Sequence, residues 1–223
     1  MVLIVKYLEE LNLMPITYPL SLPTQFKSAE ITFNTTNLVA IWEGPYDMSE
    51  QTYEFPGKRI TATIKFPKMN QANGEELIGW LMSLHGRAGT FYLNDTSKRY
   101  ARGIASGTPV VNGTQTALTT DLYTRGWSAS VTGILLAGDW IQVGTGSSVR
   151  LHKVLSDVNS DSSGHATLSV WPNLRTAYAD GTTLVTTNAS GIFRLKEDTS
   201  WTIDNSRIYT VNPITAVESV SLV

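Results

Sequence analysis

The chain contains no cysteine among its 223 residues. This absence excludes disulfide bonds, thiolate metal sites and cysteine nucleophiles. Charged residues are also scarce, at 16% of the chain against the ~25% typical of soluble domains, and the formal net charge is −2. The chain therefore has no basic field that would hold a nucleic acid, and its low charge suits a β-rich surface that neighbours partly cover.

Long apolar runs and short catalytic motifs are missing as well. Because no stretch of about 18 consecutive apolar residues exists, we expect no membrane insertion by this chain. No Gly-x-Ser-x-Gly elbow, phosphate loop or dinucleotide fingerprint is found. The first residues carry Lys6 and no small-residue cleavage site, so a signal peptide is not expected. Glu9 and Glu10 before Met14 suggest a translated ribosome-binding site, and we expect Met14 to be the natural start and residues 1–13 not to be native.

Histidine is limited to three positions. We expect His85 to lie in the last turn of a helix, where a partial positive charge is favourable. His152 is predicted at an exposed position of a strand, and His165 just after a hairpin tip. A zinc site that used both of these histidines with Asp157 or Asp161 would lack a supporting ligand spacing.

A short acidic run resembles the start of a calcium loop. Asp157, Asn159 and Asp161 supply oxygen atoms at the first three ligand spacings of such a loop. However, Ser162 stands where the loop needs glycine, and Leu168 where it needs a bidentate glutamate. We therefore predict a hairpin tip at this position, and no metal and no cofactor in the protein.

What the chain does contain is β-strand patterning. Residues 166–171 alternate apolar with polar side chains, which is the period of a half-buried strand, and the run NSDSSG (159–164) is typical of a hairpin tip. Pro56-Gly57 is predicted as a turn. Further strands are expected over residues 30–35, 38–43, 60–66, 89–93, 191–195, 201–204, 207–211 and 214–220.

One amphipathic helix is predicted from Asn73 to Gly86. Asn73 can cap its N-terminus, with Glu76 at the capping-box position three residues later. An apolar stripe then follows at helical spacing. The stripe consists of Leu77, Trp80, Leu81 and Leu84.

The composition changes along the chain and indicates its organisation. Helical patterning vanishes after Gly103, and turn signals recur up to Ser190 at intervals typical of a small barrel or sandwich. We predict a mainly β fold with a minor α component. A discontinuous β-sandwich domain (1–103 plus 191–223) with one packed helix is interrupted by a small β-barrel or sandwich insertion (104–190). Two tandem domains with a C-terminal extension are the alternative.

Several segments together resemble a known family. They are the run ELIGWLMSLHGRAGTFYLND (76–95), the inserted GDWIQVG and ATLSVWPNLR, and the closing GIFRL and WTID…RIYTV. Over roughly residues 14–220 the chain resembles the distal tail proteins of long-tailed bacteriophages. The resemblance implies a structural virion protein of the tail tip and baseplate, with no enzymatic activity.

The resemblance further implies a specific assembly. The sandwich would be a belt domain that closes into a homohexameric ring between the tail tube protein and the tail hub with its tape-measure protein. DNA would pass through the ring without specific binding. The protein would be made in the cytoplasm of the bacterial host and reside in the virion, and binding of a host glycan by the inserted domain stays open.

No catalytic residue is expected, and the candidate positions are interface positions. We expect aromatic and loop residues to supply them: Trp42, Tyr46, Tyr53, Phe55, Arg87, Tyr92, Arg99 and Tyr100.

Two alternative functions stay open at this point. A carbohydrate-binding or receptor-binding tail module would use Trp140 and Trp171 as ligand-facing aromatics. A small glycosidase would need two facing carboxylates, for which Asp47, Glu50 and Glu54 are the candidates.

Overall fold

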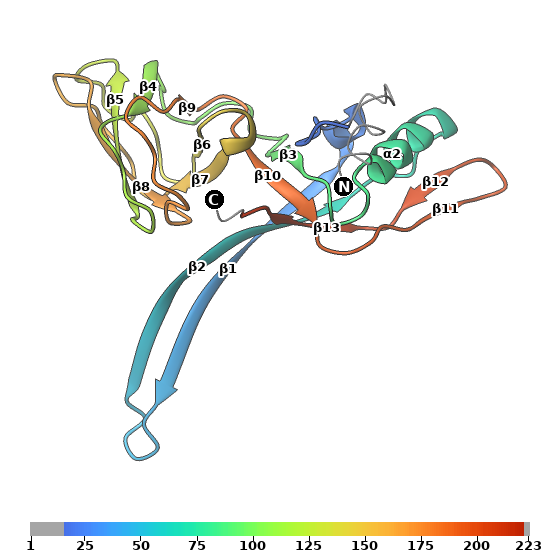
Figure 1. Ribbon diagram of the computed structural model, residues 1–223, viewed down its shortest axis with the longest axis horizontal. Coiled ribbons are helices and arrows are strands. Elements are labelled where there is room, and N and C mark those ends of the chain that lie inside the picture. The colour runs from blue at the N-terminus through green and yellow to red at the C-terminus, as the bar shows by residue number, and fades with distance from the viewer. Residues whose placement is uncertain (1–15, 221–223) are drawn as a thin grey trace, which may run out of the picture.

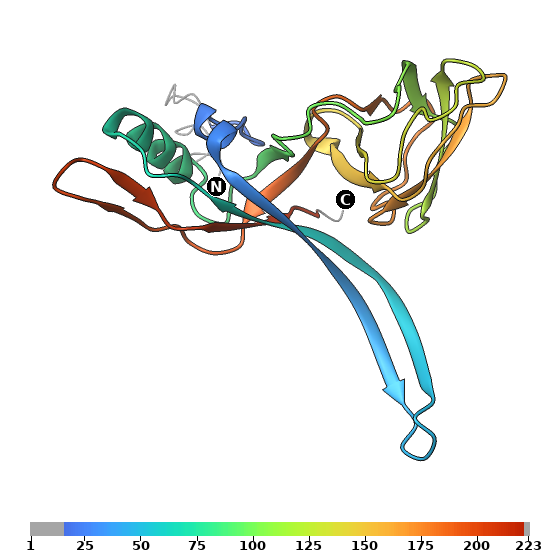
Figure 2. The same ribbon diagram turned by 180° about the vertical axis from the view of Figure 1, so that it is seen from behind.

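The computed structural model describes residues 16–220 and is mainly β, with one α-helix in that range (Figures 1 and 2). The predicted fold class, mainly β with a single packed helix, is confirmed. The predicted start at Met14 lies outside the described residues. Within them, no helix has the length and apolar character needed to cross a membrane.

One antiparallel sheet joins the two ends of the chain. Its strands are β1 (Glu30–Glu43), β2 (Glu50–Lys65), β3 (Phe91–Asn94), β10 (Ser190–Leu195) and β13 (Ile214–Glu218). They lie in the order β1, β2, β13, β10, β3. The N-terminal hairpin and the C-terminal strands therefore depend on each other, although more than a hundred residues separate them.

A second antiparallel sheet is built from residues 107–185 alone. Its strands, in spatial order, are β4 (Gly107–Val111), β5 (Asp121–Trp127), β8 (Ala166–Trp171), β7 (Arg150–Val154), β6 (Trp140–Val143) and β9 (Leu184–Val185). A bridge between Val110 and Thr183 brings the two outer strands together, so this sheet nearly closes into a barrel. The predicted hairpin tip at 159–164 lies between β7 and β8. The predicted division of the chain into domains 1–103 plus 191–223 and 104–190 stays a prediction.

Smaller elements complete the fold. A two-stranded ribbon lies beside the helix α2 in both views (Figures 1 and 2). The bounds are Gln71–Ser83 for α2, Trp201–Ile203 for β11, Tyr209–Val211 for β12, and Thr24–Ser28 and Gly146–Ser148 for the 3-10 turns η1 and η2.

The N-cap of the helix lies three residues before the predicted position. Asn70 is the N-cap, and its side-chain oxygen accepts a hydrogen bond from the Asn73 N–H at 3.1 Å. The reason is tertiary: Met69 exchanges two backbone hydrogen bonds with Tyr209, which holds the chain extended up to Asn70 and lets the helix start there. Asn73, the predicted cap, is instead inside the first turn.

The predicted apolar stripe of the helix is confirmed. Leu77, Leu81 and Leu84 are at most 2% exposed and pack against the sheet that contains β3 and β10, and Trp80 packs partly buried against the same cluster. The helix ends at Ser83 rather than at Gly86, which lies beyond it with a φ of 64°.

The hydrophobic side chains form two clusters. One joins the helix to the five-stranded sheet and includes the fully buried Phe91 and Phe193, and the other fills the six-stranded sheet. The first cluster also contains Trp140 and Leu151, which belong to strands of the six-stranded sheet. The two sheets therefore share part of one core.

Two glycines of the helix provide a matched test of this packing. A Cβ built on Gly74 would lie 2.6 Å from Cβ of Tyr209, whereas a Cβ on Gly79 would meet nothing within 4 Å. We expect Gly74→Ala to lower the free energy of unfolding by about 1–3 kcal/mol through overpacking against β12. Gly79→Ala should raise it by about 0.5–1 kcal/mol, because alanine favours the helix. Urea unfolding measures both, and equal effects of the two substitutions would contradict the described docking of β12.

Candidate assembly interface

The most conspicuous feature of the molecule is a long hairpin that extends away from both sheets. Strands β1 and β2 leave the five-stranded sheet together and run outward as a two-stranded ribbon (Figures 1 and 2). We call residues 37–58 of this ribbon the arm. From the pair Val39–Glu54 its register is continuous to the last pair, Glu43 opposite Glu50, beyond which Gly44–Ser49 form the tip.

A bulge marks the root of the arm. Between the pairs Asn37–Lys58 and Val39–Glu54, Leu38 alone faces the three residues 55–57. Pro56 and Gly57 are thus inside β2, and the turn predicted there is wrong. The strands predicted at 30–35 and 38–43 are likewise one strand. Bulges bend and twist a ribbon locally, and a proline without an N–H is tolerated in one.

The tip of the arm is held by local hydrogen bonds. The Gly44 N–H donates to the Ser49 carbonyl at 2.7 Å, and Asp47 accepts hydrogen bonds from the Ser49 hydroxyl at 2.8 Å and N–H at 3.1 Å. These bonds, that from the hydroxyl most of all, lower the pKa of Asp47 below its ordinary value. The carboxylate is thus engaged in the turn, which weakens its case as a glycosidase group.

The arm has one aromatic face and one acidic face. Residues paired across two strands project to the same face, and the faces alternate along each strand. The aromatic face carries Trp42, Tyr53 and Phe55, and the last two rings pack edge to face at 4.7 Å. The opposite face combines two aliphatic side chains with three carboxylates. These are Val39, Ile41, Glu43, Glu50 and Glu54.

Large apolar side chains of the arm are open to water. Ile41 is 66% exposed, Trp42 58%, Tyr53 64% and Tyr46 100%. In addition, residues 39–43 and 50–54 pair only with each other among the described residues, so the outer edges of both strands are unpaired. A two-stranded ribbon is marginally stable in water, and exposed apolar patches with free edges mark interaction surfaces.

The eight predicted interface residues do not form one surface. Trp42, Tyr46, Tyr53 and Phe55 lie together on the arm. The others lie on the body: Arg87 is exposed after the helix, Tyr92 is half-buried in β3, and Arg99 and Tyr100 are exposed in the segment after β3.

Sequence reasoning missed the aliphatic members of the arm. They are Leu38, Val39, Ile41 and Met48. The sequence does contain a signal for the arm, because apolar residues continue on both sides of Pro56-Gly57. The turn predicted at that position hid this continuity.

Of the two tryptophans expected to face a ligand, Trp140 lies in the shared core and Trp171 lies at the root of the arm. Trp140 is only 9% exposed, with Phe33 against it at 5.5 Å and the Lys153 ammonium 4.0 Å from its ring centroid. Burial lowers the pKa of Lys153. The Trp171 Nε1–H donates to Oδ1 of Asn37 at 3.0 Å. Trp140 is therefore largely buried, with Phe33 and Lys153 against its ring, and Trp171 ties β8 to the first residue of the arm; a ligand-facing role of either stays a prediction.

The oxygen-bearing side chains considered for metal binding accept hydrogen bonds from backbone N–H groups. Asp157 accepts a hydrogen bond from the Ala137 N–H, Asn159 from that of Gly133, and Asp161 from those of Ser163 and His165. In residues 16–220, no group of three or more His, Asp or Glu side chains is placed to hold a metal ion.

His152 corrects an expectation, since it is 1% exposed rather than on the surface. Its Nδ1 lies 2.8 Å from the Pro172 carbonyl oxygen, which can only accept, so Nδ1 carries the proton. Nε2 then accepts from the Tyr178 hydroxyl at 3.2 Å. Burial lowers the pKa of His152 to about 4 and raises that of Tyr178. The ring is a neutral structural group.

Neither the family models nor the curated proteins include a match to this chain.

The buried imidazole generates a prediction about pH. The folded protein holds His152 neutral down to about pH 4, whereas the unfolded chain protonates it near 6.5. Stability should therefore be complete above 6.5 and fall by up to about 3 kcal/mol as the pH drops toward 4. Urea unfolding across this range should show the loss in the parent and in His165→Gln, whose ring is exposed. His152→Gln should remove it, and an unchanged pH slope in that variant would refute the assignment.

Proposed function

We propose that this protein is a structural assembly protein that forms a ring, in which the arm of each copy lies along the next copy. The single observation that carries the proposal is the arm, which exposes large apolar side chains on a ribbon with two unpaired edges. An isolated ribbon of this kind gains its stability from a partner strand. The chain itself offers matching free edges, so a second copy is the partner we propose.

The geometry of the free edges supports ring closure. When strand β1 of one arm pairs with β2 of the next, each copy uses two different edges, which is a heterologous contact. Such contacts close into a ring if the rotation between copies is right, and strand addition supplies the main-chain hydrogen bonds. Side-by-side arms would then form a continuous barrel without free edges.

The two faces of the arm support an orientation within the ring. The aromatic face with Trp42 and Tyr53 suits burial against protein, since these residues dominate interface energies. The acidic face would then line the bore. Carboxylates such as Glu43, Glu50 and Glu54 repel phosphates, which fits a passage that DNA traverses without specific binding.

We place this ring at the tail tip of a long-tailed bacteriophage virion. The support is the resemblance of residues 76–95 and the later segments to distal tail proteins, together with the mainly β fold and packed helix. In this proposal the ring is hexameric, continues the tail tube on one side and seats the hub and tape-measure protein on the other. The protein is made in the host cytoplasm and acts without catalysis.

The competing functions lack a supporting observation. A carbohydrate-binding or receptor-binding module based on Trp140 is not favoured, because that side chain is only 9% exposed, with Phe33 and Lys153 against its ring. The carboxylates Glu43, Glu50 and Glu54 stand on an open ribbon, whereas catalytic pairs work in concave, water-limited sites.

The role of the arm in assembly can be tested by introducing one charged side chain. Trp42→Glu places a carboxylate on the aromatic face at an exposed site, so the fold of the monomer should be unaffected. We expect the affinity between copies to fall by about 30-fold or more, as for the loss of an interface hot spot. Mass photometry over a concentration series measures this as a shift from rings to monomers.

A control variant has the same chemistry elsewhere. Tyr123→Glu changes an equally exposed aromatic residue on β5 of the six-stranded sheet and should leave the mass distribution of the parent intact. Two results would overturn the proposal. One is a parent protein that stays monomeric at all concentrations and also forms no ring when tail tubes are added. The other is a Trp42→Glu variant that assembles as the parent does.

A further inference from the structure

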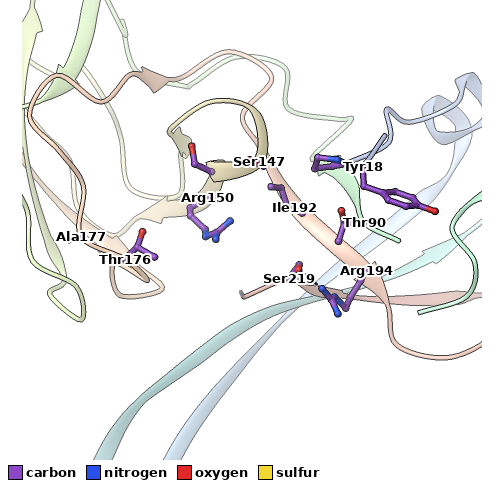
Figure 3. Close-up of a pocket in the computed structure, with 11 residues that line it drawn as sticks. Tyr18, Thr90, Ser147, Arg150, Thr176, Ala177, Ile192, Arg194 and Ser219 are labelled. Atoms are coloured by element: carbon purple, nitrogen blue, oxygen red, sulfur yellow. Dashed lines mark hydrogen bonds between the residues drawn. The ribbon is translucent and has the colours of Figure 1, made fainter. Parts of the chain in front are cut away.

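A cavity of about 580 Å³ lies at the junction of the two sheets. Figure 3 shows Arg150 of β7 reaching into it from one wall and Arg194 of β10 on another, close to Ser219. Hydroxyl groups of Ser147, Thr90 and other residues complete the polar lining, and no carboxylate contributes to it. This volume is within the range of sites that bind small molecules.

The arginines around this cavity outnumber the carboxylates available to them. Glu218, which is 2% exposed, accepts hydrogen bonds from Arg175 at 3.0 Å and from the Ile60 N–H at 3.3 Å. It is already committed to Arg175. Among residues 16–220, no carboxylate lies within salt-bridge distance of Arg150 or Arg194. The cavity wall therefore holds two guanidinium groups that form no ion pair within the described chain.

Arg150 is the more deeply buried of the two arginines. It is only 6% exposed, so its charge is largely removed from water. Among the described residues, the one hydrogen bond of its guanidinium runs from Nη1 to the carbonyl oxygen of Val149 at 2.9 Å, and its Nε is buried without a partner. Buried charges in proteins are almost always paired, because an unpaired one costs several kcal/mol. A bound anion would supply the partner that the Arg150 guanidinium needs.

Arg194, on strand β10, offers a second set of N–H donors to the cavity. It is half-buried, and its Nη2 donates to Oγ of Ser219 at 3.0 Å, which leaves its other N–H groups available. The planar guanidinium presents paired donors that match the oxygens of a carboxylate or a phosphate.

We propose that this cavity is a binding site for an oxyanion, a phosphate- or carboxylate-bearing group held between Arg150 and Arg194. The two arginines belong to different sheets, so the bound anion bridges the sheets and stabilises their junction. No residue of the arm lines this site. The group is either a free small anion or the carboxylate of a neighbouring copy, and the two sources share the same recognition chemistry.

Thermal unfolding with inorganic phosphate as the probe tests the site. Phosphate is titrated against sodium chloride at constant ionic strength, on the full chain. We expect a saturable rise in Tm of about 4 °C once phosphate is in about tenfold excess over its Kd. Arg150→Gln and Arg194→Gln should each abolish the rise. Arg194→Gln keeps the test decisive if the more buried Arg150 variant fails to fold.

Lys196→Gln is the matched control, since it removes the same charge from an exposed position two residues beyond Arg194. It should retain the full response. Phosphate also stabilises proteins by exclusion from their surface, but that effect is unsaturable and would be equal in all variants. No saturable response, or an equal response in Arg194→Gln and Lys196→Gln, would overturn the proposal.

Native mass in the same titration separates the two sources. If phosphate displaces the carboxylate of a neighbouring copy, the oligomer mass should fall along the same binding curve. If the natural ligand is a free anion, the mass should stay constant while Tm rises. In either case Arg194→Gln should remove the phosphate response, and its persistence in that variant would refute the site.

Discussion

The close approach of β10 to β7 is the contact on which the rest of the structure depends. A Cβ on Gly191 would lie 2.8 Å from Cβ of Leu151, so only glycine lets the two strands pack this tightly. Beside it, Gln142 accepts hydrogen bonds from the N–H and hydroxyl of Ser190 at 3.0 and 2.9 Å. This packing joins the two sheets into one body, brings Trp140 into the shared core and sets the walls of the arginine-lined cavity.

The joined body supports an arm that the body does not cover. Strand β2 contributes buried residues such as Ile60 and Ile64 to the core, and β1 and β2 together extend outward beyond their last sheet neighbour. At the root, Trp171 binds Asn37, and Lys58 forms an ion pair with Glu54 at 2.7 Å. The chain thus presents strand edges from a well-anchored base, an arrangement suited to association between copies.

The sequence predicted much of the fold where the pattern is local. Strand periods such as that of residues 166–171 and the apolar stripe of the helix follow from side-chain spacing alone, and both are confirmed. Features set by distant contacts were predicted wrongly. Asn70 caps the helix because Tyr209 positions the preceding residue, and His152 is buried with Pro172 and Tyr178, from the segment after β8, against its ring. Proline favours turns in general, yet Pro56 lies in a bulge opposite β1. Because a turn was predicted there, the sequence did not predict one long hairpin over residues 37–58.

The acidic face of the arm has a consequence for the newly made chain. Before any partner is present, a ribbon with free edges and exposed aromatic residues is a hazard, since it can pair with any other extended chain. Charged residues and proline placed along such a segment act as gatekeepers that oppose disordered aggregation. Glu43, Glu50 and Glu54 project from the exposed strands, and Pro56 interrupts the edge. The same carboxylates thus oppose aggregation of the chain through the exposed arm.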